Sequence, residues 1–224
     1  MSKVISIANT AGGTGKTTIA HGLATAFVEY GKKTLLIDLD PKADLTFRLG
    51  RENARITAID FFNGAKLTPN TVDTTDERFD FIGADIRLAS PQEPTALKNF
   101  LETLSNDYSL IVLDLPSSIS PPLGQAASVT DLFIIPMQQR LHDLRGALQI
   151  SSIAKDARVI ALQIGVGQPL SQDIELLDCA IELNVEIEKA QNSQRSVLTF
   201  AKESTVAENF REATYSILEE LNLT

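Results

Sequence analysis

The chain has 224 residues, 43% of them hydrophobic, and a formal net charge of −9. This composition is sufficient for one sizeable α/β domain, and no apolar run approaches the length of a membrane-spanning helix. Residues 113–224 carry 8 basic and 15 acidic side chains, a net charge of −7, which argues against a broad basic surface for nucleic acid. Cys179 is the single cysteine, which excludes a disulfide framework, and we expect it to be a small buried residue on a helix. We see no signal peptide, and expect a reducing, cytoplasmic setting.

Apolar, β-branched runs alternate with helical patterns along the chain. The expected strands are residues 3–8, 34–39, 79–82, 109–113, 132–135 and 158–164, and the expected helices are 16–30, 95–105, 124–129 and 141–155. One short helix is expected within residues 50–76, and the chain after Gly165 is expected to be helical, ending in an amphipathic helix over 205–221. Continuous hydrophobic strands separated by helices predict an α/β fold, with one doubly wound, mostly parallel sheet covered on both faces. We expect residues 1–224 to form one domain.

A glycine-rich loop joins the first expected strand to the first expected helix. Its residues are Gly12-Gly13-Thr14-Gly15-Lys16-Thr17-Thr18. Glycines allow consecutive backbone N–H groups to converge on an anion, and the helix N-terminus adds its positive dipole end. Lys16 is placed to reach the β- and γ-phosphates of a nucleotide, and the hydroxyl of Thr17 to ligate Mg²⁺. The loop therefore predicts a nucleotide-phosphate site made by all seven residues.

Three aspartates stand at the ends of two hydrophobic strands. Asp38 and Asp40 end the strand over 34–39, and Asp114 follows the strand over 109–113. The carboxyl ends of parallel strands meet at the edge of the sheet where open α/β folds bind ligands. We interpret Asp114 as the Walker B group that holds Mg²⁺, Asp40 as the group that orients the attacking water, and Asp38 as a residue that fixes the loop or supports the metal.

These motifs together resemble those of the ParA/MinD family of deviant Walker A ATPases, over nearly the whole chain. The family's Gly-Gly-x-Gly-Lys-Thr loop is matched by residues 12–17, and its Asp-x-Asp-Pro-Gln motif by residues 38–41, with Lys42 in place of glutamine. A tyrosine-led strand ending in Asp-x-Pro is matched by residues 108–116, and an Ile-Ile-Pro strand end by residues 134–136.

The resemblance implies a slow ATPase that uses Mg²⁺ and pairs face to face, with two ATP molecules between the subunits. It also implies nonspecific DNA binding by the dimer, association with the nucleoid in the ATP state, and a small adaptor or ParB-like protein that stimulates hydrolysis. Plasmids, chromosomes and protein compartments such as carboxysomes are the cargo classes that this family positions.

Ala11 departs from the family, which has a lysine there that reaches the phosphates of the partner subunit. The site is then a weak hydrolase, a lost ATP site, or a site that takes a cation from elsewhere in the chain; we favour the third hypothesis. The McdA-type subgroup, which spaces carboxysomes, lacks the same lysine and uses a later one. The candidates after the Walker B strand are Arg140, Arg145, Lys155 and Arg158. Lys155 is our first choice, ahead of Arg145 and Arg140, although it is equally suited to capping a helix C-terminus. The residues assigned to catalysis are Lys16, Asp40 and Lys155.

Other functions of this sequence stay open. The basic residues left for DNA are Lys189, Arg195, Lys202 and Arg211, and their acidic neighbours make DNA binding depend on the resemblance. A MinD-like membrane ATPase is less favoured because the last residues, 216–224, are acidic and lipid headgroups repel them, so we expect no membrane partner. A binding-only switch module is the non-enzyme alternative. Ser117 or Ser118 is a candidate γ-phosphate contact or an ordinary loop residue, and Gln163 and residues 196–204 match the family's adenine-reading positions only roughly.

Overall fold

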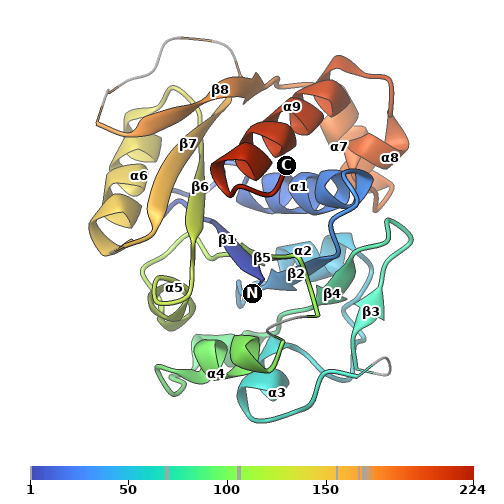
Figure 1. Cartoon of the computed structure of the whole chain (residues 1–224), viewed down its shortest axis with the longest axis vertical. Coiled ribbons are helices and arrows are strands. Elements are labelled where there is room, and N and C mark those ends of the chain that lie inside the picture. The colour runs from blue at the N-terminus through green and yellow to red at the C-terminus, as the bar shows by residue number, and fades with distance from the viewer. Residues whose placement is uncertain are drawn as a thin grey trace.

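The computed structural model describes residues 2–68, 71–104, 107–154, 156–165, 167, 171 and 173–224 (Figure 1). Within these residues one sheet has the strand order β3-β4-β2-β5-β1-β6-β7-β8. Its strands are β1 (Lys3–Ile7), β2 (Thr34–Asp38), β3 (Asp73–Thr74), β4 (Asp80–Ile82), β5 (Leu110–Asp114), β6 (Leu132–Met137), β7 (Arg158–Ile164) and β8 (Glu175–Ile181). Every pair of neighbouring strands is parallel except β3 and β4.

Helices cover both faces of this sheet (Figure 1). One face carries α1 (Lys16–Glu29), α2 (Asp44–Arg48), α7 (Val185–Asn192), α8 (Val197–Phe200) and α9 (Thr205–Glu220). The other carries α3 (Ala58–Phe62), the 3₁₀ helix η1 (Ile86–Ala89), α4 (Ala96–Thr103), α5 (Pro121–Ala126) and α6 (Leu141–Ile153). Alternate residues of each central strand enter the two cores, as Ile5 and Val4 do in β1. The predicted doubly wound, mostly parallel α/β fold is confirmed.

The prediction of helix after Gly165 is wrong for residues 175–181, which form β8, and Cys179 is therefore a half-buried strand residue. Leu176, Leu177 and Ile181 have a spacing that also suits one face of a helix. The free edge of β7 decides between the two structures, because it supplies parallel hydrogen-bonding partners to β8. Helix α3 lies where a short helix was expected, whereas α2 and the short strand β3 were not predicted.

The order of the strands brings the predicted site residues to one edge. Strands β5, β2 and β4 lie on one side of β1, and strands β6, β7 and β8 lie on the other side. The strand order therefore changes direction beside β1. Asp114 is in register with Ile7 of β1 on one side and with Asp38 of β2 on the other. Such a reversal opens a crevice at the carboxyl ends of the strands, where α/β proteins bind ligands.

Across the described part of the chain, no helix combines the length and the hydrophobicity that crossing a lipid bilayer requires.

The packing of α1 against α9 makes a testable prediction about stability. A Cβ atom added to Gly22 of α1 lies 2.2 Å from Cε1 of Phe210, a fully buried residue of α9. We expect Gly22→Ala to lower the free energy of unfolding by about 1–3 kcal/mol, as overpacking of a core does, measured by urea denaturation. The matched control is Gly124→Ala in α5, where the added Cβ has no atom within 4 Å. That substitution is expected to be neutral or to stabilise by up to about 1 kcal/mol. Equal effects of the two substitutions would contradict the close approach of α1 and α9.

Candidate nucleotide site at the carboxyl edge of the sheet

The loop after β1 has the backbone of an anion-binding turn. Gly13 and Gly15 have φ angles of 69° and 91°, a left-handed conformation that favours glycine, and Gly15 is the N-cap of α1. A Cβ atom added to Gly12 has no atom of the described residues within 4 Å, so a side chain here would not clash with them. Its missing side chain leaves the loop open to a ligand. Thr14, between the two left-handed glycines, is fully buried.

Lys16 lies across this loop. Its side chain is buried, with 7% of the residue exposed, and its Nζ donates a hydrogen bond to the backbone oxygen of Ala11 at 3.1 Å. Burial lowers the pKa of Lys16, and the charges of Asp114 and Asp40 oppose that shift. The neutral Ala11 oxygen is a weak partner for a buried ammonium group, which is suited to exchanging it for phosphate oxygens.

Asp38 and Asp114 are neighbouring carboxylates that are almost completely buried. Asp38 Oδ1 accepts a hydrogen bond from the N–H of Asp40 at 3.0 Å, and Oδ2 accepts from the N–H and hydroxyl of Thr46 at 3.0 and 2.7 Å. By contrast, Asp114 Oδ1 has no hydrogen-bond partner among the residues that the structure describes. Asp38 is therefore fixed by the protein, whereas Asp114 keeps an oxygen available to another group.

Both carboxylates bind protons more tightly than an exposed aspartate. Burial raises the pKa of Asp38 to about 7. Burial and the charge of Asp38 raise the pKa of Asp114 well above its usual value, and a hydrogen bond from Thr17 opposes this. A divalent cation near Asp114 would remove the cost of two adjacent negative charges. The unpaired oxygen and the neighbouring Thr17 hydroxyl fit Mg²⁺, which binds through few protein ligands together with waters and substrate phosphates.

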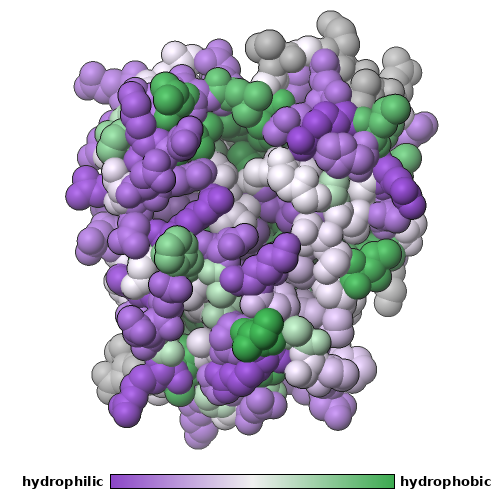
Figure 2. Space-filling view, turned by 180° about the vertical axis from the view of Figure 1, so that it is seen from behind, coloured by the Kyte–Doolittle hydropathy of each residue, from purple (hydrophilic) through white to green (hydrophobic). Residues whose placement is uncertain are grey.

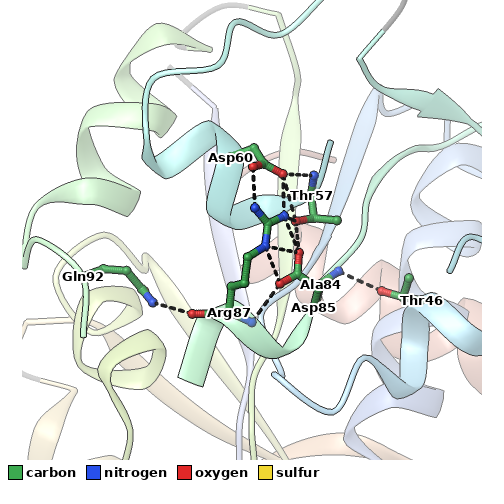
Figure 3. Close-up of polar contacts among 7 residues, drawn as sticks. All are labelled: Thr46, Thr57, Asp60, Ala84, Asp85, Arg87 and Gln92. Carbon is green, nitrogen blue, oxygen red and sulfur yellow. Dashed lines mark hydrogen bonds and ion pairs between the residues drawn. The ribbon is translucent and has the colours of Figure 1, made fainter. Parts of the chain in front are cut away.

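Hydrogen bonds extend from Asp38 through Thr46 to the next loop of the sheet edge, and Figure 3 shows the part of this chain of contacts that begins at Thr46. The Thr46 hydroxyl accepts from the N–H of Ala84 at 2.8 Å. The adjacent Asp85 shares the guanidinium group of Arg87 with Asp60 of α3, with N–O distances of 2.7–2.8 Å. The carboxylate at the end of β2 is thus held by a chain of contacts that reaches α3 and η1.

The structure brings together Lys16, Asp38, Asp40 and Asp114, as the sequence predicted. The Thr18 hydroxyl faces two donors, Arg48 Nη1 at 3.1 Å and Gln191 Nε2 at 2.7 Å. These two contacts come from α2 and α7, and no motif in the sequence indicated them. Ser117 is half-buried and Ser118 is exposed.

The candidate cations occupy different places. Lys155 lies outside the described residues. Arg158 begins β7 at the opposite, amino edge of the sheet, where it pairs with Glu175 and Glu220. Arg145 is exposed on α6. Arg140, at the N-cap of α6, donates from Nη2 to the backbone oxygen of Gly13 at 3.1 Å, so the third choice from the sequence contacts the loop.

A phosphate-binding loop between β1 and α1, with strand-end aspartates beside it, defines a P-loop nucleotide-binding protein. A model of an AAA domain family, AAA_31, matches residues 2–163. The chain is 33% identical to the sporulation initiation inhibitor protein Soj of Bacillus subtilis over 161 residues, 67% of this chain and 64% of Soj. It is 31% identical to the chromosome-partitioning ATPase Soj of Thermus thermophilus over 168 residues, 69% of this chain and 62% of that protein. The chain belongs to this AAA domain family, within the ParA/MinD group of P-loop ATPases.

The matches span less than two thirds of these two curated relatives. Solved structures with the same fold include MinD of Pyrococcus horikoshii with Mg-ADP, at a TM-score of 0.85, 22% identity, and coverage of 100% of this chain and 98% of MinD. Cobyrinic acid a,c-diamide synthase of Mycobacterium smegmatis, with ADP and magnesium, has a TM-score of 0.82 and 22% identity, and 99% and 96% of the two chains are covered. A point variant of McdA of Cyanothece in complex with ATP has a TM-score of 0.81 and 18% identity, with 96% of each chain covered.

The raised pKa values of Asp38 and Asp114 predict how stability depends on pH. The folded chain holds protons that the unfolded chain releases near pH 4, so the stability of the protein without metal falls as the pH rises from 5 to 8. Asp114→Asn removes one of the two charges. We expect the variant to gain about 2 kcal/mol in its free energy of unfolding at pH 8, which corresponds to a melting temperature roughly 4–8 °C above that of the parent. At pH 5, where the parent carboxyls hold their protons, this difference should shrink.

The measurement is differential scanning fluorimetry in EDTA across this pH range. Glu102→Gln on α4, where the side chain is 65% exposed, is the matched control and should leave the melting temperature unchanged at each pH. A melting temperature for Asp114→Asn that stays below that of the parent at pH 8 would show that the carboxylate pair does not destabilise the fold.

Proposed function

We propose that this chain binds Mg²⁺·ATP at the loop after β1 and hydrolyses it slowly, as a nucleotide-switched ATPase that positions intracellular cargo. The observation that carries the proposal is the buried Asp114 Oδ1, which has no hydrogen-bond partner among the described residues and belongs to a carboxylate beside the Thr17 hydroxyl, at the mouth of a loop with left-handed glycines. Thr17 and Asp114 would hold Mg²⁺, which neutralises phosphate charge when bound. Lys16 binds the phosphates, and Asp40 orients water for attack.

We also propose that two copies pair through their nucleotides, and that an adaptor or ParB-like protein stimulates hydrolysis. The support is the similarity to the two Soj proteins, since the Soj of Thermus thermophilus is named a chromosome-partitioning ATPase. Plasmid, chromosome or protein-compartment positioning is the class of function that follows, in the cytoplasm and on the nucleoid.

Nonspecific DNA is the proposed surface on which the ATP-bound dimer works. The corner formed by α7, α8 and α9 holds the four basic residues available for it (Figure 1). Two of them already have acidic partners: Lys189 lies 3.9 Å from Glu186, and Arg211 pairs with Glu29 and Glu208. Arg195 and Lys202 are exposed and are the residues we assign to DNA phosphates.

The membrane alternative is weaker because of the packing of α9. Its apolar residues, including Phe210 and Ile217, are fully buried against α1 and the sheet, and acidic Glu219 and Glu220 lie near its end. An interfacial helix needs a free apolar face with basic residues beside it. On the face shown in Figure 2, hydrophobic residues form small separate patches within a mostly hydrophilic surface.

The first prediction concerns nucleotide. We expect calorimetry to detect Mg²⁺·ATP binding to the parent, and Lys16→Ala to weaken it at least tenfold because the phosphates lose their charged donor. Asp40→Ala should bind ATP normally and release phosphate about 100-fold more slowly. Lys98→Ala on α4, with a side chain 55% exposed, is the control and should behave as the parent. Binding without any phosphate release, even with DNA present, would favour the binding-only switch module.

The second prediction concerns DNA. With ATP, we expect the parent to bind a random-sequence duplex with an affinity that falls with salt. Replacing Arg195 and Lys202 by Ala removes up to four phosphate contacts from a dimer and should flatten the plot of log affinity against log salt accordingly. Fluorescence anisotropy measures this, with Lys98→Ala as the reference for the loss of an exposed positive charge elsewhere on the surface. A double variant with the affinity and salt dependence of the parent would move the DNA site elsewhere.

A further inference from the structure

Helix α6 packs directly on the first half of the phosphate loop. A Cβ atom added to Gly146 of α6 lies 2.0 Å from Asn9 Oδ1 and 2.8 Å from the backbone nitrogen of Ala11. Asn9 Nδ2 donates to the backbone oxygen of Asp143 at 3.2 Å, and its Oδ1 accepts from the N–H of Ala11 at 2.9 Å. Residues at the start of α6 are therefore held in a fixed position beside the loop.

Arg140 is the charged residue that this arrangement places on the loop. Its Nε donates to Asp143 Oδ2 at 3.0 Å, and its Nη2 lies 3.1 Å from the backbone oxygen of Gly13. Asp143 is fully buried and is itself oriented by the N–H of Gln138 at 2.9 Å, while His142 Nε2 lies 3.0 Å from its other oxygen. One end of the guanidinium group is thus anchored, and the other faces the loop.

The contact between Arg140 and Gly13 is easily exchanged. The Arg140 side chain is 37% exposed, and its loop partner is a neutral carbonyl oxygen. A phosphate oxygen is a stronger, charge-assisted acceptor for a guanidinium group. A nucleotide in the loop would therefore present a better partner close to Nη2, while Asp143 continues to hold Nε.

The charges of the site call for a second cation. Asp38, Asp40 and Asp114 stand beside a single loop lysine, and Ala11 has no charge. A triphosphate brings further negative charge, and in phosphoryl transfer an arginine supplied by the same or another subunit stabilises the charge of the transition state.

We propose that Arg140 binds the γ-phosphate of the nucleotide held in its own subunit and stabilises the transition state of hydrolysis, with Asp143 as its positioning residue. The step is ordinary ATP hydrolysis: the oxygen of water bonds to the γ-phosphorus, the bond from the bridging oxygen breaks, its electron pair stays on ADP, and the proton of water passes to solvent. This inference depends on the proposed ATPase function.

Three other cations are alternatives that the same experiment separates. Lys42 is close enough to the site for its charge to lower the pKa of Lys16. Arg145 is exposed one turn further along α6, and Lys155 lies outside the described residues. Lys42, Arg145 and Lys155 are each replaced by glutamine, in parallel with Arg140→Gln. The Arg140→Gln substitution removes the positive charge and keeps a hydrogen-bond donor near Asp143.

The test measures binding and turnover separately. We expect Arg140→Gln to weaken binding of fluorescent mant-ATP by about tenfold, to leave mant-ADP within about twofold, and to slow phosphate release about 100-fold or more. Arg140→Lys should recover part of the ATP preference, and Arg145→Gln, the matched control, should keep all of it. Thermal unfolding of each variant shows whether the fold is intact. A normal ATP-to-ADP preference in a folded Arg140→Gln, or its loss in one of the other three variants instead, would overturn the proposal.

Mixing two inactive variants tests whether Arg140 acts within its own subunit. Lys16→Ala supplies Arg140 but has a defective loop, and Arg140→Gln supplies an intact loop. We expect the mixture to stay inactive; recovered phosphate release would show that Arg140 acts across the dimer and would overturn the proposal. Absence of ATP binding or hydrolysis in the parent chain would instead refute the proposed function itself.

Discussion

The structure depends on two buried carboxylates that stand side by side at the end of a parallel sheet. Asp38 and Asp114 are in register on β2 and β5; burial raises the pKa values of both, and the charge of Asp38 raises that of Asp114 further. Two such charges are costly inside a fold unless a cation compensates them. The proposed Mg²⁺ site would give this position a functional reason, because a bound cation would offset the loss of stability at this edge.

The surroundings of each carboxylate assign it a different role. Asp38 has three hydrogen bonds from the segment that begins α2, and this segment is held in turn by the loop after β4. Asp114 keeps an oxygen without such a bond in the part of the chain that the structure describes. One carboxylate thus shapes the loop that carries Asp40, and the other is left for ligand chemistry. This division explains how two chemically identical side chains serve one site without competing for the same partner.

The glycine loop is held from two sides. Helix α1 continues from it, with the positive dipole end of the helix at the loop, and α6 packs on residues 9–11 through the space left by Gly146. A loop supported in this way needs little rearrangement on binding, which lowers the entropic cost of recognising a phosphate.

The sequence by itself determined the parallel α/β fold, the phosphate loop and the three aspartates, because buried strands, glycine turns and strand-end carboxylates leave local patterns that do not depend on distant residues. Only the tertiary structure decided that residues 175–181 pair with β7 as a strand, since their apolar spacing suits a helix as well. It also decided which oxygen of the carboxylate pair stays free, and that Arg140 rather than Arg158 lies at the loop. The last of these outcomes depends on a contact between residues more than 100 positions apart along the chain, Gly13 and Arg140, and all of them depend on tertiary contacts that leave no signal in the local sequence.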